Sequence, residues 1–145
     1  MYLMKETPIV EGVTIEPSVS QVGDLYINFL CRIEGWKTKC KNLHWSASND
    51  SMHRRLDDLS EVLSSYQDAL AEDYMGINGR VRPDILTGIS SNAIEPNTFV
   101  SEIIENTLSF YSQIDSSVAY AGIKSETETF IHNLNKIKYL FSLCV

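Results

Sequence analysis

Positive charge and cysteine are both scarce in this chain of 145 residues. Twelve Lys and Arg stand against 19 Asp and Glu, giving a formal net charge of −7. The chain therefore lacks the clustered cations that displace counterions from a nucleic-acid backbone. Its three cysteines, Cys31, Cys40 and Cys144, lack the paired spacing of a zinc site and are expected to be reduced, buried thiols. We expect cations, and not nucleic acids, as partners.

Long hydrophobic runs are also missing. No apolar stretch approaches the roughly 20 residues that span a bilayer, and the opening MYLMKETPIVEG does not have the charged-then-apolar order of a secretory signal. We therefore expect a cytoplasmic protein with no membrane partner. A composition of 43% hydrophobic and 21% charged residues is ordinary for a globular protein, and the length predicts one domain with its own core.

Two long amphipathic helices are predicted in the first half of the chain. Apolar residues recur every three or four positions over residues 18–46 and over about 50–75. Ser18 with Gln21 forms a capping box at the start of the first segment, and Gly76 is expected to end the second. The turn between them, SASND, is short, so the two helices should lie antiparallel.

Two further helices are predicted in the second half. The first covers about 97–119, where an apolar stripe runs from Phe99 to Val118. The other begins at a second capping box, Ser125 with Glu128, and continues to the C-terminus.

About 20 residues, GINGRVRPDILTGISSNAIEP, separate the second and third helices. Their apolar patch, Ile85, Leu86 and Ile89, predicts one small helix within this crossover. Two helical hairpins joined by one long crossover define the ferritin-like form of the four-helix bundle. The predicted fold class is therefore all-α, with a ferritin-like four-helix bundle over 18–145 and an extended N-terminal arm over 1–17.

The second predicted helix carries a stripe of metal-ligand side chains. His53, Asp57, Asp68 and Glu72 fall within about 100° of one another in a helical projection. Asp57 and Asp68 are separated by about 16 Å along the axis, too far for one ion with bonds of about 2.0–2.6 Å. In a two-fold antiparallel dimer, His53 and Asp57 of one chain would face Asp68 and Glu72 of the other. The spacing therefore predicts two equal sites between subunits.

These residues resemble the signature of the Dps-type mini-ferritins. The resemblance rests on KNLHW at the end of the first helix, His53 with an acid four residues later, and D-x-x-x-E after ten more. It covers residues 18–145 and implies an oligomeric shell, a dodecameric cage in that family, that stores iron. The shell would oxidise Fe(II) with peroxide or oxygen between subunits.

The resemblance also implies a ligand set. The implied iron ligands, which zinc or another divalent metal would also fit, are His44, His53 and Asp57 from one subunit and Asp68 and Glu72 from its partner. Trp45 occupies the place of a tryptophan beside the site in that family. Glu61 lies on the same stripe and is an accessory candidate.

A second interpretation is a structural or interaction subunit, for example inside a virus particle, that keeps the bundle with a degenerate metal site. The turn SASNDSM is shorter than in the family, and DYM replaces its usual AER. In the plainest alternative the stripe is a solvated helix face, with Arg54 paired to Asp58 and His44 interacting with the helix dipole. A di-iron centre within one subunit is not expected, because the chain has no Glu-x-x-His pair.

Overall fold

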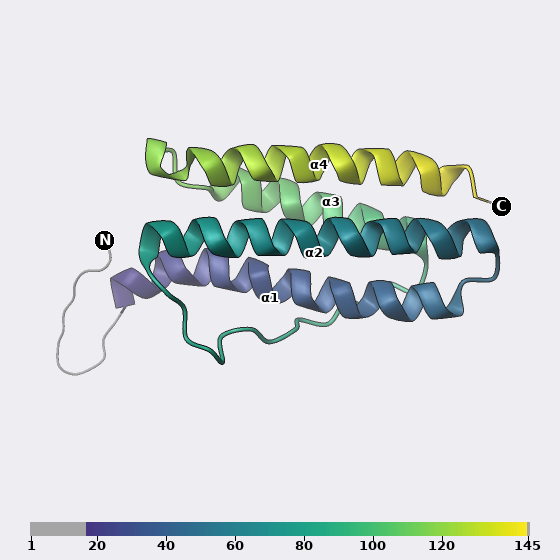
Figure 1. Cartoon of the computed structure of the whole chain (residues 1–145), viewed down its shortest axis with the longest axis horizontal. Helices are drawn as coiled ribbons and strands as arrows, with labels where there is room; N and C mark the ends of the chain where they lie inside the picture. The colour runs from purple at the N-terminus through teal and green to yellow at the C-terminus, as the bar shows by residue number, and fades with distance from the viewer. Residues whose placement is uncertain (1–16, 145) are drawn as a thin grey trace.

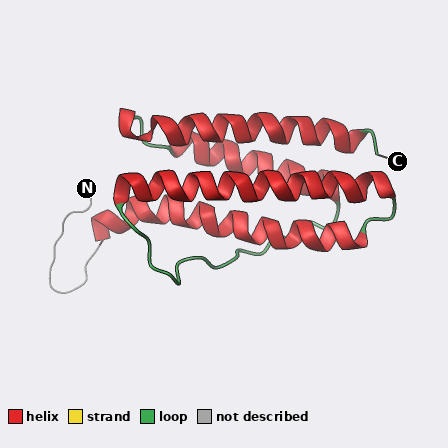
Figure 2. Cartoon of the chain, viewed as in Figure 1, coloured by secondary structure: helices red, strands yellow, loops and turns green. Residues whose placement is uncertain are grey.

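The computed structural model describes residues 17–144, with side chains from residue 25 onward. It contains α1 (Pro17–Ser46), α2 (Asp50–Asn78), α3 (Pro96–Gln113), the short 3₁₀ helix η1 (Val118–Tyr120) and α4 (Ala121–Ser142). Figure 2 shows that every regular element of the described chain is helical. The predicted all-α four-helix bundle is therefore confirmed. The extended arm predicted for 1–17 lies outside the described residues, apart from Pro17, which begins α1.

The four helices form a ring of antiparallel neighbours (Figure 1). α1 packs on α2, α2 on α4 and α4 on α3, while the seam between α1 and α3 is the most open. Because the long connection returns to the far end of the bundle, α2 and α3 run in the same direction. None of the described helices is long and apolar enough to cross a membrane.

The core joins the apolar stripes of all four helices, largely as the periodicity predicts. An aromatic group fills one half: Phe29 stacks on Phe110 at 4.0 Å between ring centroids, and Tyr26 packs against Tyr74 and Tyr120 at 5.4 Å. Farther along, Tyr66 stacks on Phe130, also at 4.0 Å. Such rings bury large apolar areas, which is the main stabilising term of a bundle of this size.

Two residues of the apolar stripe predicted over 97–119 lie outside the core, Leu108 of α3 and Val118 of η1. Leu108 and Val118 were expected in the core, but they are 49% and 90% exposed. Phe110 and Thr107 take the buried positions, and the Thr107 hydroxyl donates to the carbonyl of Ile103, 2.7 Å away. A buried threonine whose hydroxyl is satisfied within its own helix is compatible with a core position.

The crossover lies directly on the backbone of α1. The Ile89 N–H donates to the Cys31 carbonyl at 3.0 Å, and the Thr87 N–H donates to the Cys31 sulfur at 3.4 Å. A Cβ atom at Gly35 would lie 1.7 Å from the Ile89 carbonyl oxygen. Only glycine therefore permits this approach, and α1 supplies hydrogen-bond partners that the crossover cannot find within itself.

The prediction of a small helix in the crossover is wrong. Between Asn78 and Pro96 the chain has no helix, only a turn in which the Ile85 N–H donates to the Arg82 carbonyl at 3.2 Å. The bundle is about 40 Å long, because α2 rises 1.5 Å per residue, and the 17 residues of this segment must return along that length. Fully extended, 17 residues reach about 56 Å. Little slack remains for a helical segment.

α2 also continues farther than predicted. It passes through Gly76 and ends at Asn78, where Gly79 has φ 89° and donates its N–H to the Met75 carbonyl at 2.7 Å. Positive φ favours glycine, so the second of the two glycines ends the helix.

The boundary between α3 and α4 differs from the prediction as well. α3 ends at Gln113, because Asp115 accepts a hydrogen bond from the Ser117 N–H at 2.8 Å and forms a turn. α4 begins at Ala121, so the predicted capping residue Ser125 lies inside the helix.

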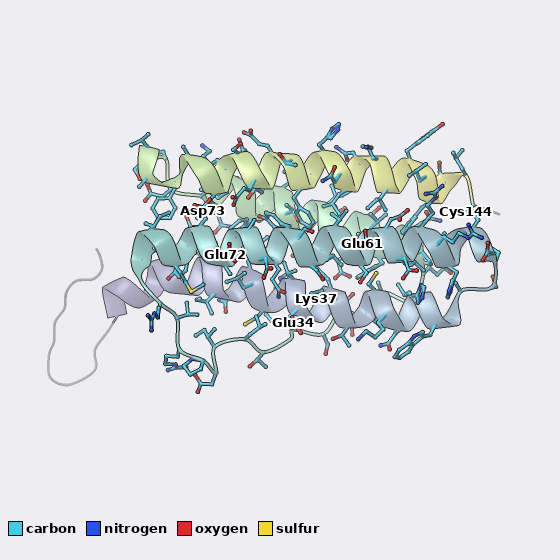
Figure 3. All side chains as sticks on the ribbon, viewed as in Figure 1. Glu34, Lys37, Glu61, Glu72, Asp73 and Cys144 are labelled. Carbon is cyan, nitrogen blue, oxygen red and sulfur yellow. The ribbon has the colours of Figure 1, made fainter. Side chains whose placement is uncertain are left out.

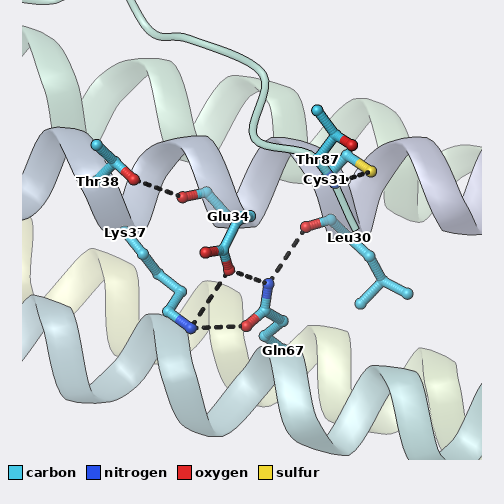
Figure 4. A network of polar contacts seen from close by, with 7 residues as sticks. All are labelled: Leu30, Cys31, Glu34, Lys37, Thr38, Gln67 and Thr87. Carbon is cyan, nitrogen blue, oxygen red and sulfur yellow. Dashed lines mark hydrogen bonds and ion pairs between the residues drawn. The ribbon is translucent and has the colours of Figure 1, made fainter. Parts of the chain in front are cut away.

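A buried amide fixes α1 against α2 (Figure 4). Gln67, 8% exposed, donates to the Glu34 carboxylate at 3.1 Å and to the Leu30 carbonyl at 3.4 Å. Its own oxygen accepts from the Lys37 ammonium at 2.9 Å. Because an unsatisfied buried amide is costly, this network specifies one alignment of the two helices.

We predict that Gly35→Ala lowers the free energy of unfolding by about 2–3 kcal/mol, because the added methyl overlaps the crossover. The matched control is Gly76→Ala, whose Cβ meets nothing within 4 Å in α2 and should raise stability by about 0.5–1 kcal/mol. Denaturant unfolding of both variants measures the difference. Equal effects of the two substitutions would show that the crossover does not depend on Gly35.

Candidate metal centre

The α1–α2 turn places two histidines opposite each other. α1 ends at Ser46, and the Asn49 side chain caps α2 by accepting from the Met52 N–H at 2.7 Å. Asn and Asp side chains favour this position because they satisfy a free N–H of the first helical turn. The three-residue turn brings His44, in the last turn of α1, level with His53, in the first turn of α2.

His44 and His53 are held by reciprocal hydrogen bonds. Nδ1 of His44 donates to the His53 carbonyl at 2.8 Å, and Nδ1 of His53 donates to the His44 carbonyl at 2.9 Å. The rings stack with centroids 3.8 Å apart and planes 22° apart. Because a carbonyl oxygen only accepts, each Nδ1 carries a proton, and each neutral ring has its lone pair on Nε2.

Asp57 lies next to one of these free nitrogens. Its Oδ1 is 3.5 Å from His44 Nε2, longer than a good hydrogen bond. Two ligands of one ion, with bonds of about 2.1 Å and an angle of about 90–110°, stand about 3.0–3.5 Å apart. The Asp57 side chain is 65% exposed and that of His44 18%. The spacing of the pair is therefore that of two neighbouring metal ligands at the protein surface.

Asp68 and Glu72 lie toward the opposite end of α2, both exposed. Figure 3 labels Glu72 near the end of α2 that is far from the α1–α2 turn. Within the described part of the chain, no three His, Cys, Asp or Glu side chains are placed to hold one ion. His44 is brought to His53 and to Asp57, but these three side chains are not placed to hold one ion together, and Asp68 and Glu72 lie elsewhere on α2.

The ion pairs observed on α2 differ from the one that the solvated-face interpretation predicts. Arg54 pairs with Asp50 at 2.8 Å and not with Asp58, because Asp50 lies one turn earlier on the same side of α2. Asp58 is instead paired with Arg55 at 3.0 Å. Both arginines are thus engaged away from the histidines, and Asp57 forms no ion pair with a lysine or arginine among the described residues.

The two accessory candidates have different surroundings. Trp45 follows His44 directly and is 70% exposed, unusual for a side chain of this size. Glu61 lines a groove between α2 and α4, together with residues of α4. This groove is a different surface from the one on which His44 meets Asp57, so Glu61 has no observed contact with the histidines.

Two carboxyl groups that sequence reasoning missed meet at the seam of α2 and α4. A Cβ atom at Gly122 would lie 2.8 Å from Asp73 Oδ2, so the glycine admits Asp73 to the surface of α4. Burial, then hydrogen bonding to Asp73 and the negative charges of Asp73 and Glu72, raise the pKa of Glu126 from 4.5 to about 7. Figure 3 labels Asp73 on the side of α2 that faces α4. The raised pKa lets the Glu126 carboxyl keep its proton up to near-neutral pH and donate it in a hydrogen bond to Asp73.

Comparison of the chain with protein-family models, with curated proteins and with solved structures finds no match. The function of the chain must therefore be inferred from the geometry of its residues.

We predict that Glu126 makes stability depend on pH. With its pKa raised, the folded state binds more protons than the unfolded chain between pH 4.5 and about 7, so stability falls as pH rises through that window. Glu126→Gln should flatten this dependence and stabilise the fold at alkaline pH by about 1 kcal/mol, a value reduced for solvent screening. Unfolding measured across the pH range checks it, with the exposed Glu105→Gln as control. An unchanged pH profile in Glu126→Gln would contradict the raised pKa of Glu126.

Proposed function

We propose that the chain is a Dps-like, ferritin-like protein that binds Fe(II) between two copies of itself and oxidises it. The observation that carries the proposal is the histidine pair of the α1–α2 turn. Both Nδ1 atoms donate to backbone carbonyls, which leaves both Nε2 lone pairs available, and one of them lies 3.5 Å from Asp57. Metal-binding histidines usually donate their second ring N–H in this way, since the bond fixes the ring and its tautomer.

The positions of the remaining acids support a second copy. On α2, His53 and Glu72 lie at equal distances from a point between Val62 and Leu63, and so do Asp57 and Asp68. A two-fold axis at that point would place Asp68 and Glu72 of one copy opposite Asp57 and His53 of the other. The same arrangement would occur twice, once at each end of the paired helices. A single two-fold axis therefore accounts for both pairs, His53 with Glu72 and Asp57 with Asp68.

The surface at the centre of this stripe is compatible with close approach. Ser60 and Ser64 lie there, and Ser64 is exposed. Small side chains allow two antiparallel helices to come close enough for ligands from both to reach one ion. Each completed site would hold two imidazoles and three carboxylates once the side chains of His44, His53 and Asp57, which do not converge on one point in a single copy, turn toward the ion. Such a set suits Fe(II), and zinc as a redox-inert substitute.

Oxidation of Fe(II) follows from what such a site supplies. Carboxylates stabilise the higher charge of Fe(III), and a site at the protein surface is open to oxygen or peroxide, which accepts the electron that each Fe(II) releases. The imidazoles must be unprotonated to bind, so we expect binding to weaken in acid. A shell of many copies would then retain the ferric product.

The alternative is a structural or interaction subunit that has kept the bundle but not the chemistry. Large apolar side chains exposed at separate places favour it, chiefly Trp45 at 70%, Ile94 at 80% and Val118 at 90%. Exposed apolar side chains of this size are typical of contact surfaces. The two functions differ in whether the purified chain oxidises Fe(II) and assembles alone.

We predict that His53→Ala and Asp57→Ala each weaken Fe(II) binding about 10-fold or more and slow its oxidation, because each removes a ligand. The matched control is His132→Ala, since His132 is the third histidine, exposed on α4 with no partner in the described chain. Anaerobic calorimetry measures binding, and ultraviolet absorbance measures Fe(III) formation after addition of oxygen or peroxide. A wild-type chain that neither binds nor oxidises Fe(II) would refute the proposal.

We also predict that the purified chain is at least dimeric and that Ser64→Arg makes it monomeric. Two arginines would meet across the proposed axis and add both bulk and like charge. Light scattering gives the mass, with Ser112→Arg on the exposed surface of α3 as control. A wild-type monomer that assembles only with other proteins would instead support the interaction subunit.

A further inference from the structure

A groove of about 400 Å³ runs along the seam between α2 and α4. Its lining includes Val62, Tyr66 and Ala69 from α2 and Phe130 from α4, with Ser65 and Thr129 among the polar residues. Tyr66 and Phe130 stack at 4.0 Å and are buried, so the apolar base of the groove is part of the rigid core. The volume lies in the range of small-molecule sites.

Each end of the groove carries one carboxylate. Three contacts set the register of antiparallel α2 and α4: the Tyr66 and Thr127 hydroxyls are 2.7 Å apart, Tyr66 stacks on Phe130, and Asp73 lies at Gly122. They bring Glu126 level with residues 67–70, so Glu61 is six to nine positions away on α2, about 9–13 Å along the groove. One metal ion, with bonds of about 2.0–2.6 Å, cannot touch both.

The arrangement is complementary to a long, thin molecule with a cation at each end. We propose that this groove binds a linear aliphatic polyamine, with one ammonium at Glu61, another at Glu126 and the methylene chain over Val62, Tyr66, Ala69 and Phe130. Ammonium groups donate to carboxylates, and methylenes lose contact with water against the apolar base. The hydroxyls of Ser65 and Thr129 offer acceptors to an amine within the chain.

The charge of the protein supports this choice of ligand. A net charge of −7 attracts cations to the whole surface, and an apolar base between two carboxylates selects among them. A hydrated divalent metal ion gains nothing from Tyr66 or Phe130, whereas an aliphatic chain does. Length is the second criterion, because a short diamine must be fully extended to reach both carboxylates, whereas a longer polyamine reaches both without that constraint.

The test is calorimetric titration of the whole chain with spermidine, at about pH 8 and constant ionic strength. We expect spermidine to bind about 10-fold tighter than the shorter diamine putrescine, and Glu61→Gln and Glu126→Gln each to weaken spermidine binding about 10-fold. Ser65→Phe, which fills the groove without removing charge, should abolish binding. Circular dichroism checks that each variant keeps its helices.

The matched control is Glu105→Gln, which removes the same charge from the exposed surface of α3 and should leave spermidine affinity unchanged. If Glu105→Gln weakens binding as much as Glu61→Gln does, or if Mg²⁺ displaces spermidine at equal charge concentration, only diffuse attraction is present and the proposal is wrong. Equal affinity for putrescine and spermidine would also overturn it, because the greater length of spermidine would then contribute nothing. None of these outcomes depends on Fe(II) binding.

Discussion

The absence of a side chain at Gly35 is the constraint on which the arrangement of this bundle depends. The Ile89 carbonyl oxygen occupies the space that a Cβ atom would need, and the neighbouring amides of the crossover donate to Cys31 on the same helix. The crossover is thereby held along α1 and reaches the far end of the bundle. There Glu102 of α3 accepts from the Trp36 indole at 3.0 Å and from the Ser91 hydroxyl at 2.9 Å, so α1, the crossover and α3 are tied at one point. α3 must then run parallel to α2.

This route of the crossover decides which surface remains free. The crossover covers α1 at Cys31 and Gly35, and the polar stripe of α2 stays exposed at Asp57, Asp68 and Glu72. The network around Gln67 holds α1 and α2 in one alignment, so the stripe is presented on a rigid pair of helices. A rigid surface is what an inter-subunit site needs, because ligands that are about 16 Å apart in one chain must meet partners at fixed positions in another.

The periodicity of apolar residues was sufficient to predict the helices. Contacts between residues far apart in the sequence account for the errors of that prediction. The spacing of apolar residues predicted four helices and most of the core, since one face of each must be buried. It failed for the crossover, where the Ile85 carbonyl accepts from the Cys31 thiol and the Ile89 N–H donates to the Cys31 carbonyl, so the segment is held by α1 and not by a helix of its own. It also missed the pairing of Asp73 with Glu126, because only the absent side chain of Gly122 brings α2 and α4 so close.

For the candidate site, the sequence supplied the residue types. The reciprocal bonds of His44 and His53 depend on turn geometry that no spacing rule contains.

The acids of α2 are divided between two surfaces with different chemistry, and distance separates them. Beside the histidines, Asp57 stands 3.5 Å from a nitrogen lone pair, a spacing that suits one small ion. Along the α4 seam, Glu61 and Glu126 stand about 9–13 Å apart over aromatic rings, a spacing that suits an extended organic cation. In the two proposals, the same net charge attracts both kinds of cation and the local geometry distinguishes them: imidazole lone pairs favour a transition metal, whereas an apolar base favours a methylene chain.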